Sequence, residues 1–157
     1  MQAIEVLPVA LVENRIVSLR PAHAGSFVVG WPAGAKPEVV AANALHMLGL
    51  QALVLHSTSW RHSNAEVVLT YLAVVAPEFA LPQSWEAVSV RHAELARGDT
   101  TAPPPVIGIE QVVEHALRHL AWLSKEDAVI GEAVPGWRDV LEGYVPEPFR
   151  ALGGPPG

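Results

Sequence analysis

Residues 30–50 read GWPAGAKPEVVAANALHMLGL, and the predicted fold depends on this stretch. Pro37 is tolerated in the first turn of a helix, Glu38 complements the positive end of the helix dipole, and Gly49 is a natural helix stop. These signals predict a helix over Val39–Leu48. Because this helix is apolar on nearly every side, we expect a sheet to cover one side and a partner the other. The partner would be a second copy of the chain, so the sequence predicts a homodimer.

Six apolar runs on either side of this helix are typical of β-strands. Two junctions between them, Glu13-Asn14 and Ser63-Asn64, contain residues that favour tight turns, which indicates two β-hairpins. The predicted strands are Ile4–Val12, Arg15–Arg20, Ser26–Trp31, Ala52–His62, Ala65–Val75 and Trp85–Val90.

The C-terminal third of the chain is predicted to be mainly helical. Apolar residues recur at helical spacing in Ile109–Ser124, and a last short helix is expected from Pro135 to about Tyr144. Before them, Asp99–Pro105 ends in three consecutive prolines, which exclude a helix or a central strand. This segment is predicted to be an extended connector.

The length of 157 residues suffices for one well-formed core and is too short for two ordinary domains. Together, the strands and helices place the chain in the α/β class. We therefore expect a single domain over residues 1–152, followed by a disordered tail at 153–157.

The composition limits the partners and the compartment. The net charge is -6 and the ten Lys and Arg residues form no run, so nucleic acid is not expected as a partner. No apolar stretch approaches the ~20 residues that span a bilayer, so we expect no membrane association. Because the chain has no cysteine and shows no export signal, a cytoplasmic location is expected. Fourteen prolines and many alanines suggest a GC-rich bacterial genome.

The order of these elements resembles the Nudix fold, an α/β/α sandwich with a mixed sheet. The resemblance covers about Ile4–Leu123. Within it, Gly30–Gly34 is similar to the loop that precedes the Nudix helix, and Ala41–Leu50 is similar to that helix with its closing Gly-hydrophobic pair. The resemblance therefore implies a Nudix-like domain.

The family's catalytic motif is not reproduced on this helix. In that motif, an arginine and three glutamates support the divalent cations that activate water on a diphosphate. Aligned on Gly49, the arginine position holds Ala42 and the glutamate positions hold Asn43, His46 and Met47. Hard cations such as Mg²⁺ need oxygen ligands, preferably charged ones. The sequence therefore predicts a degenerate Nudix box without Mg²⁺-dependent hydrolysis, and we assign no catalytic residue.

A candidate ligand-binding face lies in the second hairpin. Because side chains alternate along a strand, positions 56, 58, 60 and 62 are expected on one face. If the loop consists of Ser63 and Asn64, His56 lies opposite Tyr71. Arg61 could bind an anionic group nearby. The alternative is a half-exposed strand face that only packs. The candidate ligand-binding residues are His56, Thr58, Trp60, Arg61, His62 and Tyr71.

A metal site is a second possibility. His115 and His119 have the i, i+4 spacing that lets two imidazoles share one metal ion. Glu110 and Glu114 fall on the opposite flank of this helix, so a third ligand would have to come from another histidine. The candidates are His23, His56, His62 and His92. The alternative is a polar helix flank at a contact between domains or subunits.

Three functions remain open from the sequence. The preferred one is a non-catalytic Nudix-like domain, without a cofactor, that binds a small molecule or a protein partner. The first alternative is a divergent hydrolase of a nucleotide-like substrate, in which histidines hold a divalent transition metal. The second alternative is a dimeric structural or interaction module.

Overall fold

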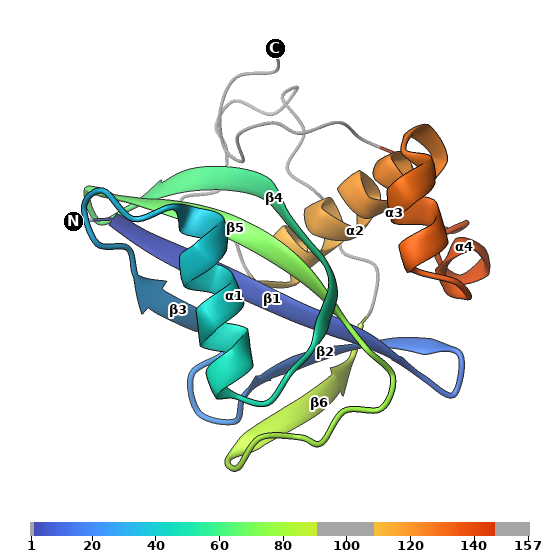
Figure 1. The fold of residues 1–157 in the computed structure, drawn as a ribbon, viewed down its shortest axis with the longest axis horizontal. Helices are drawn as coiled ribbons and strands as arrows, with labels where there is room; N and C mark the ends of the chain where they lie inside the picture. Colours follow the sequence, from blue (N-terminus) through green and yellow to red (C-terminus); the bar gives the residue numbers. More distant parts are fainter. Residues whose placement is uncertain (1, 91–108, 147–157) are drawn as a thin grey trace.

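The computed structural model of the chain describes residues 2–90 and 109–146, which form a mixed six-stranded sheet covered by helices on both faces (Figure 1). The predicted connector at 99–105 and the tail at 153–157 lie outside these residues. The elements are β1 (Gln2–Val12), β2 (Arg15–Pro21), β3 (Phe27–Gly30), α1 (Pro37–Met47), β4 (Ala52–Ser63), β5 (Glu66–Val75), β6 (Trp85–Ser89), α2 (Ile109–Glu126), α3 (Ala128–Ala133) and α4 (Trp137–Val140).

Strand β1 organises the sheet. It pairs antiparallel with β2 and β3 and parallel with β5, which makes the sheet mixed, as predicted. The strand order is β4-β5-β1-β2-β6, with β3 beside β1 off this path. Every residue of β1 from Ala3 to Ala10 is buried, because helices cover both faces of this strand. The predicted α/β sandwich is therefore confirmed.

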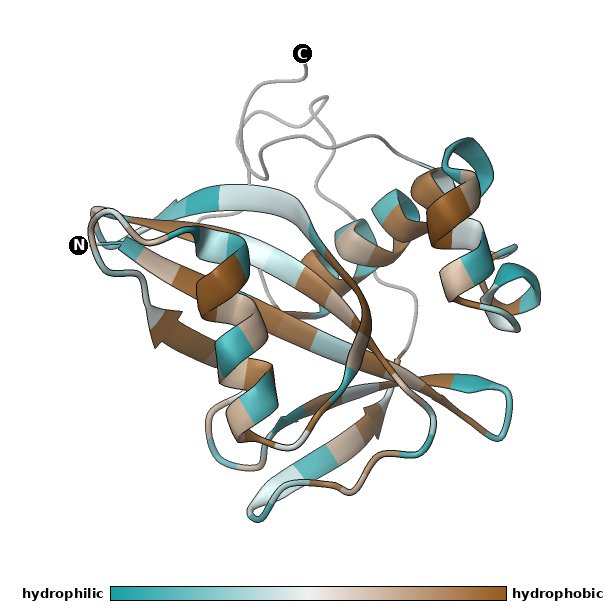
Figure 2. Cartoon of the chain, in the orientation of Figure 1, coloured by the Kyte–Doolittle hydropathy of each residue, from teal (hydrophilic) through white to brown (hydrophobic). Residues whose placement is uncertain are grey.

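Two apolar layers hold the helices to the sheet (Figure 2). Helix α1 covers one face, where Ala41 and Leu45 pack on Ile4, Val6 and Tyr71. On the other face, the second layer consists of apolar side chains of β1, β5, α2 and the C-terminal segment, including Leu7, Leu72, Leu117, Leu120 and Trp137.

Helix α1 has only one buried side within the chain. Its buried residues are Ala41 and Leu45, whereas Val39 is 49% exposed and Met47 is 86% exposed. The helix ends close to the predicted position, and Gly49 takes the left-handed conformation (φ 73°) that follows a helix C-terminus. No described residue of the chain covers the outer side of α1, where a partner was expected.

The turn between β4 and β5 differs from the prediction. Its two residues are Asn64 and Ala65, with φ values of 50° and 66°, and Ser63 pairs with Glu66. Asparagine tolerates positive φ better than most residues, so it occupies a central position of the turn rather than the last one. The predicted loop, Ser63-Asn64, was displaced by one residue.

A β-bulge also changes the faces of β4. The pairing shifts between Ser57 and Ser59, so that His56 lies opposite Leu72 while Trp60 lies opposite Leu69. Since Leu72 and Leu69 point to opposite faces of β5, His56 and Trp60 do as well. The prediction that positions 56, 58, 60 and 62 share one face is therefore wrong, and so is the pairing of His56 with Tyr71.

The C-terminal helices differ from the single helix predicted from Pro135. Helix α3 begins earlier, where the Asp127 side chain accepts hydrogen bonds from the amides of Val129 (3.0 Å) and Ile130 (3.4 Å). Helix α4 follows Gly136, whose φ of 86° interrupts the helical backbone. None of the described helices has the length and apolarity needed to cross a bilayer.

Candidate functional site

The structure divides the predicted ligand-binding residues between the two faces of the sheet. His56 and Arg61 point to the face covered by α2, and Thr58 is buried in the bulge. Trp60 and His62 lie on the other face, where their rings meet edge to face at 5.5 Å. Tyr71 is buried in the layer beneath α1, where burial, and secondarily the charge of Glu38, raise the pKa of its phenol. The six residues therefore form no single pocket.

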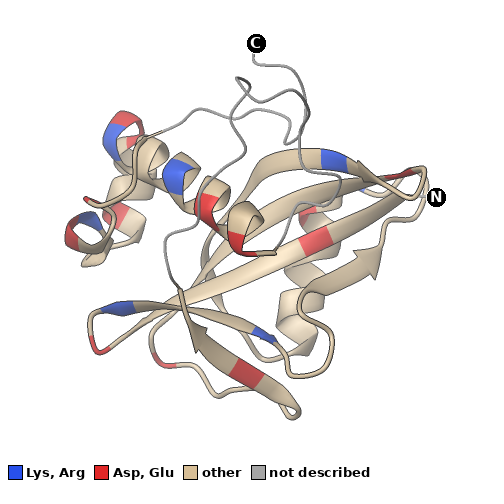
Figure 3. Ribbon diagram, turned by 180° about the vertical axis from the view of Figure 1, so that it is seen from behind, with Lys and Arg blue, Asp and Glu red and all other residues tan. Residues whose placement is uncertain are grey.

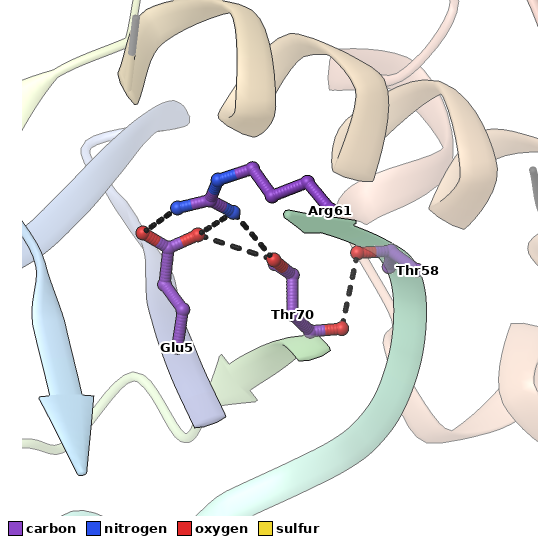
Figure 4. A network of polar contacts seen from close by, with 4 residues as sticks. All are labelled: Glu5, Thr58, Arg61 and Thr70. Carbon is purple, nitrogen blue, oxygen red and sulfur yellow. Dashed lines mark hydrogen bonds and ion pairs between the residues drawn. The ribbon is translucent and has the colours of Figure 1, made fainter. Parts of the chain in front are cut away.

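Arg61 is engaged by the chain itself (Figure 4). Its two terminal nitrogens lie 2.8 and 2.9 Å from the two carboxylate oxygens of Glu5. This bidentate ion pair is stronger than a single hydrogen bond. Arg61 Nη1 also donates to the Thr70 hydroxyl at 3.1 Å, and that hydroxyl donates to Glu5 at 3.1 Å. The anion that Arg61 was expected to bind is thus supplied internally by Glu5.

The histidines of α2 are buried against β4. His115 is fully buried, and its Nε2 donates to the Thr58 carbonyl at 3.2 Å. The ring of His119 lies 5.3 Å from the ring of His56 and is stacked on Trp122 at 5.9 Å. These contacts place the helix flank inside the molecule rather than at its surface.

A metal site requires at least three convergent ligands, and the arrangement of these histidines does not provide them. His56 Nδ1 is 2.8 Å from the Ser57 carbonyl and therefore donates to it, as His115 Nε2 does to Thr58. Within residues 2–90 and 109–146, no three His, Asp or Glu side chains are grouped so that they could hold a metal ion. His92, one of the proposed third ligands, lies outside these ranges.

On α1, Asn43, His46 and Met47 are exposed and point away from the sheet. Glu38, in the first turn, is also exposed, and it is the only acidic residue of this helix. The outer side of α1 therefore presents an amide, an imidazole and a thioether to solvent, which is a poor ligand set for a hard cation.

A cavity that the sequence analysis did not identify lies between β2, β6 and the first two turns of α2. Its floor follows from the strand pairing: Ser18 lies opposite Val88, and Arg20 lies opposite Glu86. These pairs point to the same face as Ile16, which is part of the core beneath α2. The cavity has a volume of about 360 Å³ and is lined by Ser18, Arg20, Val88, Ser89, Val90, Ile109, Glu110 and Val113.

The cavity is lined by apolar side chains and by charged ones. Val88, Val90, Ile109 and Val113 supply the apolar surface. Arg20 Nε donates to a Glu86 carboxylate oxygen at 3.2 Å, so one positive and one negative charge offset each other there. Glu110 is exposed and forms no ion pair with a described residue. Among the described lining residues, the charge that is not offset by an ion pair is therefore the negative charge of Glu110.

Only part of this cavity could be recognised from the sequence. The alternation of Ile16, Ser18 and Arg20 was visible and correctly indicated a strand. The partner strand, β6, is more than sixty residues away in the sequence, and α2 is more distant still. No local periodicity shows that segments so far apart meet on one face.

The basic residues are scattered over several elements, as Figure 3 shows for the face covered by α2. Two of the arginines are held in ion pairs below the surface: Arg61 with Glu5, and Arg118 with Glu114 at 3.1 Å.

Solved structures with a similar fold were found. A crystal structure of NrtR from Shewanella oneidensis in complex with a 27mer DNA is similar with a TM-score of 0.59 and 11% identity, over 92% of this chain and 77% of that one. A second NrtR crystal structure has the same TM-score and 12% identity, over 92% and 79% of the two chains. The NUDIX domain of NrtR in complex with ADP ribose gives a TM-score of 0.43 and 13% identity, over 76% and 88%.

No protein-family model matches the sequence, and no curated protein matches it either. At 11–12% identity, the structural similarity establishes the fold and nothing further. The chain has a Nudix-like α/β fold, as the order of its elements implied.

Proposed function

We propose that this Nudix-like domain is a non-catalytic binding module, and that its ligand is a small molecule held in the cavity between β2, β6 and α2. The cavity is the observation that carries the proposal. Its volume of about 360 Å³ falls within the range of roughly 300–1,000 Å³ for small-molecule sites. Four apolar side chains and a few polar groups in the lining also match the usual composition of such sites.

The proposal places the ligand away from His56 and Arg61, the centre of the site expected from the sequence. A ligand there would have to compete with Glu5 for Arg61, and Thr58 is only 1% exposed. The cavity needs no such rearrangement, because its lining already surrounds open space.

The absence of catalysis is proposed on the chemistry of α1. If α1 corresponds to the Nudix helix, the positions of the catalytic glutamates hold Asn43, His46 and Met47. The alternative hydrolase would rely on His115 and His119, both of which are less than 3% exposed. A substrate would have to displace the groups that cover them, and this disfavours the alternative.

A second candidate function, the dimeric interaction module, is favoured by the outer side of α1. Val39 and Met47 are exposed two turns apart on this helix, and large exposed apolar side chains often mark a contact surface. This function is compatible with ligand binding, since α1 and the cavity lie on opposite faces of the sheet.

Val88→Trp tests the proposed function, because an indole at this position would fill the cavity from its floor. Ala87→Trp is the matched control, since Ala87 is the neighbouring residue of β6, is exposed and points to the opposite face. Thermal unfolding is followed for the whole chain against a panel of small metabolites, including amines, carboxylates, sugars and nucleotides. A ligand that binds only the folded state raises its unfolding temperature.

The expected result is a shift for at least one compound, retained by Ala87→Trp and lost with Val88→Trp. A shift that survives Val88→Trp would place the ligand elsewhere. No shift with any compound would contradict the proposal and leave the interaction module as the better account.

A further inference from the structure

We infer that the ligand of this cavity is a small organic amine, with an apolar body between the valine and isoleucine side chains and a protonated nitrogen near Glu110. This inference rests on the proposed function and narrows it to one class of ligand. It follows from the charges in the cavity lining and from the chemistry of the cavity walls.

The charges favour a cation. Arg20 is paired with Glu86, so the guanidinium is already offset by a carboxylate of the neighbouring strand. Glu110 has no such partner among the described residues. An anionic ligand near Arg20 would compete with Glu86 and would also face Glu110, whereas an ammonium group would be attracted by Glu110. The net charge of -6 on the whole chain acts in the same direction.

The walls require an apolar body next to that charge. The cavity is lined by Val88 of β6, by Val90, which follows this strand, and by Ile109 and Val113 of α2. Burying apolar surface between them contributes about 25 cal/mol per Å². A bare inorganic cation or a small polar ion could not use this surface.

Hydrogen bonding provides a third indication. Ser18 points into the cavity from β2, and its hydroxyl makes no hydrogen bond within the described part of the chain. The Glu110 carboxylate only accepts hydrogen bonds and the Ser18 hydroxyl can accept as well as donate, whereas an ammonium group carries only donors. The polar groups are therefore complementary to an amine.

Three probes with the same carbon skeleton separate the effect of ligand charge on binding from the effect of ligand shape. Phenethylamine, 2-phenylethanol and phenylacetate have the same ring and chain length, and they are positive, neutral and negative at neutral pH. Binding is measured by NMR titration of the side-chain methyl groups of Val88, Val113 and Ile109 in the intact protein, at low and at high salt.

Phenethylamine is expected to bind about threefold to fivefold more tightly than 2-phenylethanol, as one solvent-exposed ion pair allows. Phenylacetate is expected to bind more weakly than either. The preference for the amine should decrease at high salt, because exposed charges are screened.

Glu110→Gln tests the residue that carries the inference. It should reduce the preference for the amine to less than twofold while leaving the affinity for 2-phenylethanol unchanged. Glu126→Gln, an exposed glutamate in the last turn of the same helix, is the control and should preserve the preference.

The outcomes separate this inference from the proposed function. If 2-phenylethanol or phenylacetate binds as tightly as phenethylamine, the cavity binds small molecules and only the amine class is wrong. The same holds if Glu110→Gln leaves the preference intact. If none of the three probes moves the methyl resonances at millimolar concentration, both the inference and the cavity as a binding site are contradicted.

Discussion

The guanidinium of Arg61 and the carboxylate of Glu5 form a bidentate ion pair, with nitrogen-oxygen distances of 2.8 and 2.9 Å, across the intervening strand β5. Thr70 of β5 lies between them and hydrogen-bonds to both. The pair thereby connects the edge strand β4 to the central strand β1. Because the carboxylate side chain is only 2% exposed, either charge left alone would be poorly solvated.

The first prediction concerns the loss of one member of this pair. Glu5→Leu should lower the free energy of unfolding by about 3 kcal/mol, because it leaves a largely buried guanidinium without its carboxylate. The double variant Glu5→Leu/Arg61→Met should recover most of that loss. Urea unfolding at pH 7 measures both.

The partly exposed pair Arg20–Glu86 provides the control. Arg20→Met should cost at most ~1 kcal/mol, as for other surface pairs. If Glu5→Leu cost no more than Arg20→Met, the buried pair would not contribute to stability in the way its geometry implies.

The second prediction concerns the β4–β5 turn. Ala65 has a φ of 66°, a conformation in which its Cβ is strained and glycine is not. Ala65→Gly should therefore raise the free energy of unfolding by up to about 1 kcal/mol, and Asn-Gly is also the preferred pair for this type of turn. Ala42→Gly, at an exposed position of α1, should have the opposite sign. Destabilisation by Ala65→Gly would contradict the assigned turn.

The third prediction concerns alkaline pH. Burial, and secondarily the negative charge of Glu114, raise the pKa of the Tyr144 phenol from its usual value near 10 to about 12. A phenol with a raised pKa in the folded state contributes stability that is complete below pH 10 and is lost as the pH rises towards 12. The contribution is on the order of 2 kcal/mol.

Tyr144→Phe should remove that part of the alkaline loss. The measurement is the difference in unfolding free energy between pH 9 and pH 11.5 in the two proteins. Equal losses would show that Tyr144 titrates near its usual value. The variant retains Tyr71, whose pKa is also raised, so a smaller loss at high pH should remain.

The fourth prediction concerns the contact between α2 and α3. A Cβ atom at Gly131 would lie 2.8 Å from the Ser124 carbonyl oxygen, which is too close for any real contact. Because the obstacle is backbone, Gly131→Ala should destabilise the protein by about 1–3 kcal/mol. Gly30→Ala, where an added Cβ meets no atom within 4 Å, should cost less than ~1 kcal/mol. A neutral Gly131→Ala would mean that α3 packs less closely on α2.

The fifth prediction concerns the proposed homodimer. If α1 forms the contact, Met47→Glu should convert the dimer to a monomer without unfolding it, because Met47 is 86% exposed within one chain. Light scattering after size-exclusion chromatography gives the mass, and Val129→Glu, at another exposed apolar position, is the control. A wild-type protein that is monomeric at high concentration would contradict the dimer directly.

Much of the fold could be predicted from the sequence because its strands carry local signals. The hairpin turn at Glu13-Asn14, the glycine after α1 and the apolar spacing of α2 are each defined by a few neighbouring residues. The pairing of β2 with β6 depends on segments far apart in the sequence, and so the cavity was not foreseen.

The residues predicted to form one ligand-binding face do not do so, for a different reason. A strict period of two assumes an uninterrupted strand, and the extra residue near Thr58 ends that alternation. No residue in this segment marks a bulge in the way a glycine would. The internal partner of Arg61, Glu5, is fifty-six positions away and lies in an otherwise apolar run.

The bulge in β4 shifts the alternation of side chains between the two faces of the strand by one residue. One additional residue near Thr58 lets His56 face α2 while Arg61, five positions later, still faces the same side. Deleting Thr58 would place Arg61 four positions after His56, so a regular strand without the bulge would keep both side chains on the face covered by α2. A gap of one residue at Thr58 in a related sequence would therefore indicate a strand that lacks the bulge and retains the ion pair between Arg61 and Glu5.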